Sequence, residues 1–140
     1  MRAISMLSLV ALLGGVAALG CDDGDEGENA GHPCQTVDDC YPEIEDPATL
    51  QGEIVCMDRV PGGYCTHHCV TDADCCAVEN ECDTDFPQVC APFESTGEYY
   101  CFLSCEDAVD EAAWCHEGAG EYFSCRSTGG GTDNRKVCVP

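Results

Sequence analysis

Cysteine is the residue that most constrains what this chain can fold into. Fourteen of the 119 residues that follow Cys21 are cysteines, about 12%, which is above the roughly 8–10% that marks a disulfide scaffold. Leu, Ile, Val and Phe together contribute only 17 residues to the same stretch, so a hydrophobic core alone would not offset the conformational entropy of folding. Disulfides constrain the unfolded chain and persist in oxidising compartments. We therefore predict a small disulfide-rich fold outside the cytoplasm.

The first twenty residues have the pattern of a signal peptide. Arg2 is the only charge before Asp22, and residues 3–20 form an uncharged, mostly apolar run of the kind that export signals contain. A membrane-spanning helix is the alternative, because eighteen residues lie near its lower length limit, although Gly14 and Gly15 weaken that interpretation. Either segment would export residues 21–140.

Cys21 is the odd cysteine in a total of fifteen, and an odd count in an exported chain calls for a separate explanation. It follows Ala18-Leu19-Gly20 directly, and this stretch resembles the lipobox of bacterial lipoproteins, with Ala18 in a place where Leu is more usual. The resemblance implies that Cys21 carries a thioether-linked diacylglycerol and anchors the protein in a membrane of the cell envelope. The alternative is that Cys21 is the last residue of an ordinary signal peptide.

The mature chain is strongly acidic. Four basic residues face 27 acidic ones after Arg2 is removed, a net charge of −23. Nucleic acid is excluded as a partner, because its phosphates require Lys and Arg, and anionic membrane surfaces would repel the domain. Self-repulsion that favours solubility is the simplest role for this charge; a cationic partner or weak binding of a divalent cation is the alternative.

The cysteines after Cys21 repeat with a period of about 35 residues, and all of them are predicted to form disulfides. We predict an acidic, disordered tether at 21–33 and three tandem stapled units at 34–68, 69–104 and 105–140, with short strands, turns and one or two helical turns. The bridges are expected mostly within units, with Cys76–Cys82 as the additional pair. The fourteen cysteines are Cys34, Cys40, Cys56, Cys65, Cys69, Cys75, Cys76, Cys82, Cys90, Cys101, Cys105, Cys115, Cys125 and Cys138.

The starts of the first two units are similar. Residues 34–40 (CQTVDDC) and 69–75 (CVTDADC) share both cysteines, a Thr and an Asp, and Thr with acids in the first turn favours a capped helical turn. The third unit has no such Thr. There Ser104 is the predicted cap of a helix over 106–114.

These spacings resemble the cysteine-rich repeats of bacterial surface lipoproteins and, more distantly, the Dickkopf N-terminal type of disulfide module. The resemblance covers 34–104 well and 105–140 loosely, and it implies a surface location but little about activity. In the third unit, residues 125–138 contain a glycine-rich stretch between two short arms, and this pattern predicts a hairpin. Its basic residues Arg126, Arg135 and Lys136 are either a docking point or partners of nearby acids.

No catalytic motif is present. His67 and His68 lie between Cys65 and Cys69, and Cys with His is typical of zinc sites, but an exported chain would use these cysteines in bridges. Neither a redox Cys-x-x-Cys pair nor a nucleophile elbow or phosphate loop occurs. We predict that the protein is not an enzyme and has neither metal nor cofactor.

Two classes of function remain open. The first is a lipid-anchored binding or structural module with a protein partner of unknown identity. The second is an inhibitor of an extracellular protease that presents the longest cysteine-free stretch, residues 41–55, as a rigid loop. Ile44, Leu50 and Ile54 would then be recognition residues; alternatively Leu50, Ile54 and Val55 form a strand in the small core.

Overall fold

A computed structural model describes residues 29–82, 85–94, 96–129 and 131–140. Cys21 and most of the predicted tether lie outside the described residues. The fold is small and disulfide-rich, with short strands and 3-10 turns, as the cysteine content predicted. In chain order the elements are η1 (Val37–Asp39), η2 (Pro47–Thr49), β1 (Ile54–Cys56), β2 (Cys65–His67), η3 (Asp72–Cys76), β3 (Gln88–Pro92), β4 (Tyr99–Leu103), α1 (Glu111–Gly118), β5 (Ser124–Ser127), η4 (Gly131–Asp133) and β6 (Lys136–Val139).

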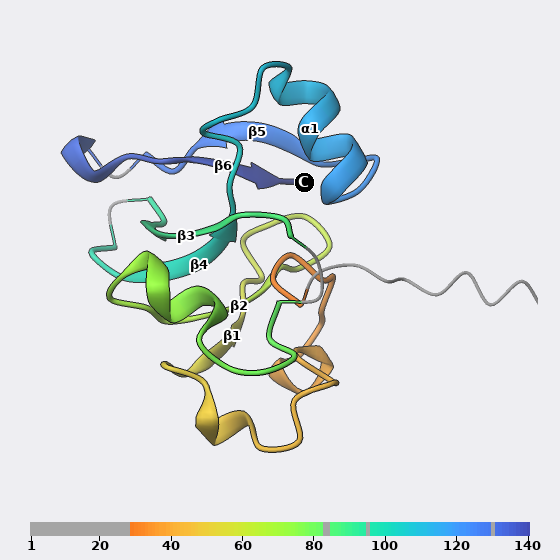
Figure 1. Cartoon of the computed structure of the whole chain (residues 1–140), viewed down its shortest axis with the longest axis vertical. Helices are drawn as coiled ribbons and strands as arrows, with labels where there is room; N and C mark the ends of the chain where they lie inside the picture. The colour runs from red at the N-terminus through yellow and green to blue at the C-terminus, as the bar shows by residue number, and fades with distance from the viewer. Residues whose placement is uncertain (1–28, 83–84, 95, 130) are drawn as a thin grey trace, which may run out of the picture.

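The strands form three antiparallel hairpins, β1–β2, β3–β4 and β5–β6. In Figure 1 the β3–β4 hairpin lies between the other two. The register places a cysteine opposite a cysteine in every hairpin: Cys56 faces Cys65, Cys90 faces Cys101 and Cys125 faces Cys138. The hairpin predicted at 125–138 is confirmed by the pairing of β5 with β6.

The facing cysteines are not bonded to each other. Each hairpin is instead joined to the first two cysteines of its segment. With Cys76 and Cys82 set aside, every segment has four cysteines, of which the first pairs with the third and the second with the fourth. All bridges lie within the predicted segments, and the predicted Cys76–Cys82 pair is confirmed. The disulfides are Cys34–Cys56, Cys40–Cys65, Cys69–Cys90, Cys75–Cys101, Cys76–Cys82, Cys105–Cys125 and Cys115–Cys138.

The turns before the first two hairpins are capped by acids. The Asp39 carboxylate accepts hydrogen bonds from the backbone N–H groups of Gln35 and Thr36, at 2.8 and 2.9 Å. Asp74 does the same for Val70 and Thr71, at 2.9 and 2.7 Å. These backbone donors favour the ionised carboxylate and hold the pKa of both acids below the usual 3.8. The predicted capped turns are therefore present, with the Asp side chain as the acceptor.

The predicted helix begins later than expected. Ser104 Oγ accepts a hydrogen bond from Glu106 N–H, but residues 106–110 contain a turn and a bend rather than helix. Helix α1 begins after Asp110, whose carboxylate accepts from Ala113 N–H at 3.1 Å. Asp110 is an N-cap in the usual sense, and the Trp114 indole N–H turns back to donate to the Ser104 carbonyl.

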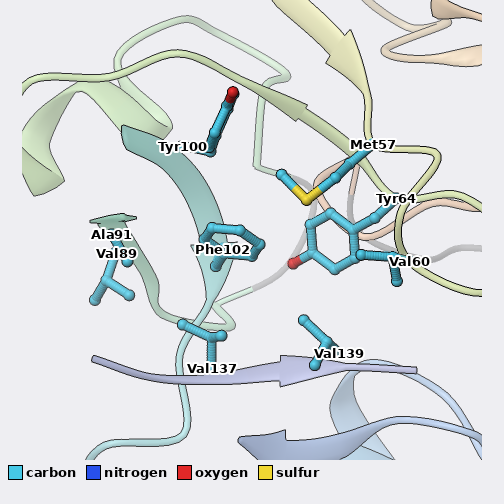
Figure 2. Close-up of a cluster of buried hydrophobic side chains, with 9 residues drawn as sticks. All are labelled: Met57, Val60, Tyr64, Val89, Ala91, Tyr100, Phe102, Val137 and Val139. Atoms are coloured by element: carbon cyan, nitrogen blue, oxygen red, sulfur yellow. The ribbon is translucent and has the colours of Figure 1, made fainter. Parts of the chain in front are cut away.

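The main hydrophobic cluster is shared by all three hairpins rather than divided among them. Figure 2 shows Phe102 of β4 between side chains from the flanking segments. Tyr64, a fully buried residue, lies with its ring centroid 5.3 Å from that of Phe102. The cluster contains Met57, Val60, Tyr64, Val89, Ala91, Tyr100, Phe102, Val137 and Val139.

Polar contacts also cross from one hairpin to the next. Buried Thr66 donates from Oγ1 to the Cys101 carbonyl at 2.6 Å, and Leu103 N–H donates to the Tyr64 hydroxyl at 3.1 Å. Single β-bridges pair His68 with Tyr100 and Ser104 with Val137. The three hairpins are therefore bonded to one another as well as stapled internally.

Candidate functional site

A hollow of about 310 Å³ opens where loops from all three segments meet. Its apolar part includes Val60 and Val139, which belong to the shared hydrophobic cluster, and Phe93, which packs against that cluster. Arg59 and Arg126 also line it. The complete lining is Arg59, Val60, Pro61, Phe93, Glu94, Arg126, Ser127, Thr128, Gly129, Val139 and Pro140.

Glu94 ties the three segments together at this hollow. Its backbone N–H donates to the Thr128 carbonyl at 2.9 Å, and its carboxylate accepts from Arg59 Nη1 at 3.0 Å. Its φ of 56° lies in the left-handed region, which is uncommon for a residue other than glycine. The hydrogen bond fixes the backbone of Glu94 against Thr128 of the third segment, while its ion pair with Arg59 is exposed to solvent.

A smaller hollow of about 160 Å³ adjoins the first and shares Arg59 and Phe93 with it. Tyr100 lines it and donates its hydroxyl to Glu98 at 2.7 Å. Burial and the bond to Glu98 raise the pKa of Tyr100 to about 12. This hydroxyl therefore stays protonated at physiological pH and acts as a donor.

The basic residues predicted as a docking tip separate into two groups. Arg135 makes a two-pronged contact with Glu106, at 2.7 Å from both Nε and Nη2, and a second with Asp72, at 3.0 and 3.2 Å. Lys136 pairs with Glu111. For these two the alternative interpretation, pairing with nearby acids, is confirmed.

Arg135 also sets the ionisation of its partners. Hydrogen bonds from Arg135 hold the pKa of Glu106 below its ordinary value. Burial alone would raise the pKa of Asp72, but hydrogen bonds from Arg135 and from Cys90 N–H, together with the guanidinium charge, outweigh it and lower that pKa. Asp72 belongs to the turn before the second hairpin, so Arg135 joins the second segment to the third.

Arg126 differs from the other basic residues that the structure describes. Its Nε donates to Ser124 Oγ at 2.9 Å, and no carboxylate within the described ranges pairs with it. The side chain is exposed at the rim of the larger hollow. Nothing in the sequence indicated that Arg59, 67 positions before Arg126, would line the same hollow.

The histidine pair has a structural role. Cys65 and Cys69 are both in disulfides, which leaves no thiolate for zinc. His67 is fully buried, with Nε2 2.7 Å from Glu81 Oε1 and Nδ1 2.9 Å from the His68 carbonyl oxygen. Nothing in the sequence identified Glu81 as its partner, because their association depends on the tertiary fold.

The 41–55 stretch has its apolar residues turned inward. Ile44 and Leu50 are 8% and 7% exposed and pack with Tyr41 in a second cluster. Ile54 and Val55 begin strand β1, as the alternative interpretation expected, whereas Leu50 lies before that strand. Of the side chains that would recognise a protease, Ile44 and Leu50 are core residues and Ile54 is partly buried against them.

None of the helices among the described residues is long and apolar enough to span a membrane. Comparisons of the chain with protein-family models, with curated proteins and with solved structures find no match. The resemblance to bacterial surface lipoproteins therefore stays a prediction.

Proposed function

We propose that the protein is a lipid-anchored module, displayed outside the cytoplasm, that binds another protein through the surface of its three clamped hairpins. The observation that carries this proposal is that all fourteen cysteines after Cys21 are used in disulfides. Seven disulfides indicate an oxidising environment. The apolar run at 3–20 that ends in the lipobox-like Ala18-Leu19-Gly20-Cys21 supports export and an anchor.

We further propose that the segments 34–68, 69–104 and 105–140 are copies of one unit. Three features support this: each has the same disulfide order, the same antiparallel hairpin, and cysteines that face each other in register. In each segment the sulfurs of the first, second and fourth cysteines of the shared pattern lie within 4.8 Å of one another.

A binding role is favoured over catalysis by the chemistry of the described surface. The hollow has an apolar floor and a few charged groups, which is the composition of a ligand site. Its charged groups are guanidinium and carboxylate side chains, and neither histidine nor a thiol lines it. Protease inhibition through residues 41–55 remains a weaker alternative, because Ile44 and Leu50 are buried.

The anchor is tested by replacing Cys21 with Ser in the full chain. We expect the wild-type protein to incorporate labelled fatty acid and to enter the detergent phase in a phase-partition assay, because two or more acyl chains hold a protein at a membrane stably. Cys21→Ser should incorporate no label and keep residues 1–20. Partition of the wild type into the aqueous phase would refute the lipoprotein assignment. The double variant Cys76→Ser with Cys82→Ser is the control, because it removes cysteines elsewhere without leaving an unpaired thiol and should still be lipidated.

A further inference from the structure

The distribution of basic residues singles out the larger hollow. The chain carries a net charge of −22 with only five Lys and Arg residues. Arg135 and Lys136 are held by acids outside the hollow. The remaining two that the structure describes, Arg59 and Arg126, both line it. Glu94 pairs with Arg59, and no side-chain carboxylate of the described residues pairs with Arg126, so Arg126 is the guanidinium of the hollow that is open to an added anion.

The hollow combines this charge with an apolar floor. Val60 and Val139 line the hollow and belong to the shared cluster, and Phe93 lines the hollow and packs against that cluster. Arg126 lies at the rim, and no ion pair among the described residues involves its guanidinium. A guanidinium binds a carboxylate through two parallel hydrogen bonds. A fitting ligand therefore carries a carboxylate next to an apolar group.

Size and long-range charge narrow the class of ligand. About 310 Å³ is at the low end for ligand pockets and accommodates one amino-acid side chain rather than a long segment. The acidic surface repels a partner with many acidic residues. Arg126 attracts a single carboxylate that comes within roughly the 8 Å screening length of physiological salt. A single carboxylate beside a single apolar side chain meets both conditions, and the last residue of a polypeptide carries both groups.

We propose that this hollow binds the free C-terminus of a partner protein that ends in an apolar residue. Arg126 receives the terminal carboxylate, and Val60, Phe93 and Val139 contact the terminal side chain. The exposed Arg59–Glu94 ion pair also lines the hollow. This inference deepens the proposed display function by naming the class of partner, and its test is independent of the anchor.

The test measures fluorescence anisotropy of labelled peptides on the oxidised full chain in nonionic detergent. The probe is the peptide Lys-Ala-Lys-Ala-Leu with a free carboxyl end and a neutral dye on its amino end; its controls are the C-terminal amide and the peptide ending in Gly. We expect the free acid to bind about fivefold more tightly than the amide, the upper end of the effect of one exposed ion pair. The Gly-ending peptide should also bind more weakly.

Variants of the protein assign the site. Arg126→Gln should weaken binding of the free acid about fivefold and leave binding of the amide unchanged, and Arg126→Lys should restore part of it. Lys136→Gln is the matched control, because it removes one charge outside the hollow and should not change binding. Arg126 is exposed, so unchanged thermal unfolding of Arg126→Gln is expected and is checked in parallel.

Equal binding of acid and amide, no binding at millimolar peptide, or full binding by Arg126→Gln would overturn the proposal. If Arg126→Gln were misfolded, the acid and amide comparison on the wild-type chain would still decide it. Absence of lipid on Cys21 would refute the anchor without changing any of these binding results.

Discussion

The first two segments and the third reach the same disulfide order through different connections. In 34–40 and 69–75 the leading cysteines are six residues apart and enclose a 3-10 turn capped by Asp39 or Asp74. In the third segment they are ten apart, and Cys115 lies within the eight-residue helix α1, after its first four residues. The corresponding sulfurs nevertheless gather within 4.8 Å in all three.

This difference shows which part of the cysteine pattern can change in length without changing the disulfide order. An α-helix advances about 1.5 Å per residue, whereas an extended strand advances about 3.3 Å, so four additional residues in helical form add little length. The order of cysteines relative to the hairpin is preserved, and the connection before the hairpin is free to vary. We therefore expect the disulfide-bonded hairpins and their shared core to supply most of the free energy of unfolding. The turns should stabilise only the residues next to them.

Reduction of all disulfides should have the largest effect. If the clamped hairpins carry the fold, a strong reductant at neutral pH should unfold all three segments together without denaturant, because the chain then has the low apolar content and high charge of a disordered protein. Amide proton dispersion and circular dichroism measure this. A reduced protein that kept a cooperative thermal transition, or kept only the third segment folded, would contradict it.

Truncation of Phe102 tests whether the hairpins share one core. Phe102 is fully buried, and Phe→Ala in such a position costs about 3–5 kcal/mol. Because its cluster includes residues of all three segments, a single unfolding transition should move to lower denaturant concentration. Two separate transitions would show that the segments unfold independently. Exposed Tyr122→Ala is the control and should change the midpoint little.

Loss of the Cys76–Cys82 bridge should lower the free energy of unfolding less than loss of a bridge that joins a hairpin to the start of its segment. Cys76–Cys82 closes a separation of 6 residues and Cys69–Cys90 one of 21. The chain-entropy relation gives a loss of about 2 kcal/mol for Cys76→Ser with Cys82→Ser and about 3 kcal/mol for Cys69→Ser with Cys90→Ser. Denaturant unfolding of the two double variants gives the comparison. Equal losses would show that the clamps have no special role.

Acidification should have the smallest effect of these changes. It should destabilise the two turns that Asp39 and Asp74 cap. The folded-state pKa values of Asp39 and Asp74 are lowered, so their contribution to stability is present above pH 3.8 and is lost as the pH falls through the folded values. Amide shifts of Gln35, Thr36, Val70 and Thr71 should titrate below pH 3.8.

A single variant serves as the control for this titration. Asp74→Asn should abolish the change at Val70 and Thr71 and leave Gln35 and Thr36 titrating, because the amide side chain does not ionise. Midpoints at or above 3.8 in the wild-type chain would show that the carboxylates are not stabilised by their backbone donors.

Much of this fold could be predicted from the sequence, because cysteine spacing is a local and countable property. The fold class, the last hairpin, the confinement of disulfides to segments and the Cys76–Cys82 pair followed from it. The helix start did not, because Ser104 and Asp110 are both suitable caps and only the packing of Trp114 against Phe86 and the Cys115–Cys138 bond fix its position.

The candidate site could not be predicted in the same way. Arg59, Glu94 and Arg126 come from three segments, and their meeting depends on how the hairpins pack. The burial of Ile44 and Leu50 and the partnership of His67 with Glu81 depend equally on tertiary contacts. The sequence by itself determined that cross-links replace a large core, since composition sets the balance of burial against chain entropy. Only the tertiary structure decided that the three hairpins share one hydrophobic cluster and line one hollow that contains Arg59 and Arg126, because which side chains meet across segments is a property of packing rather than of spacing.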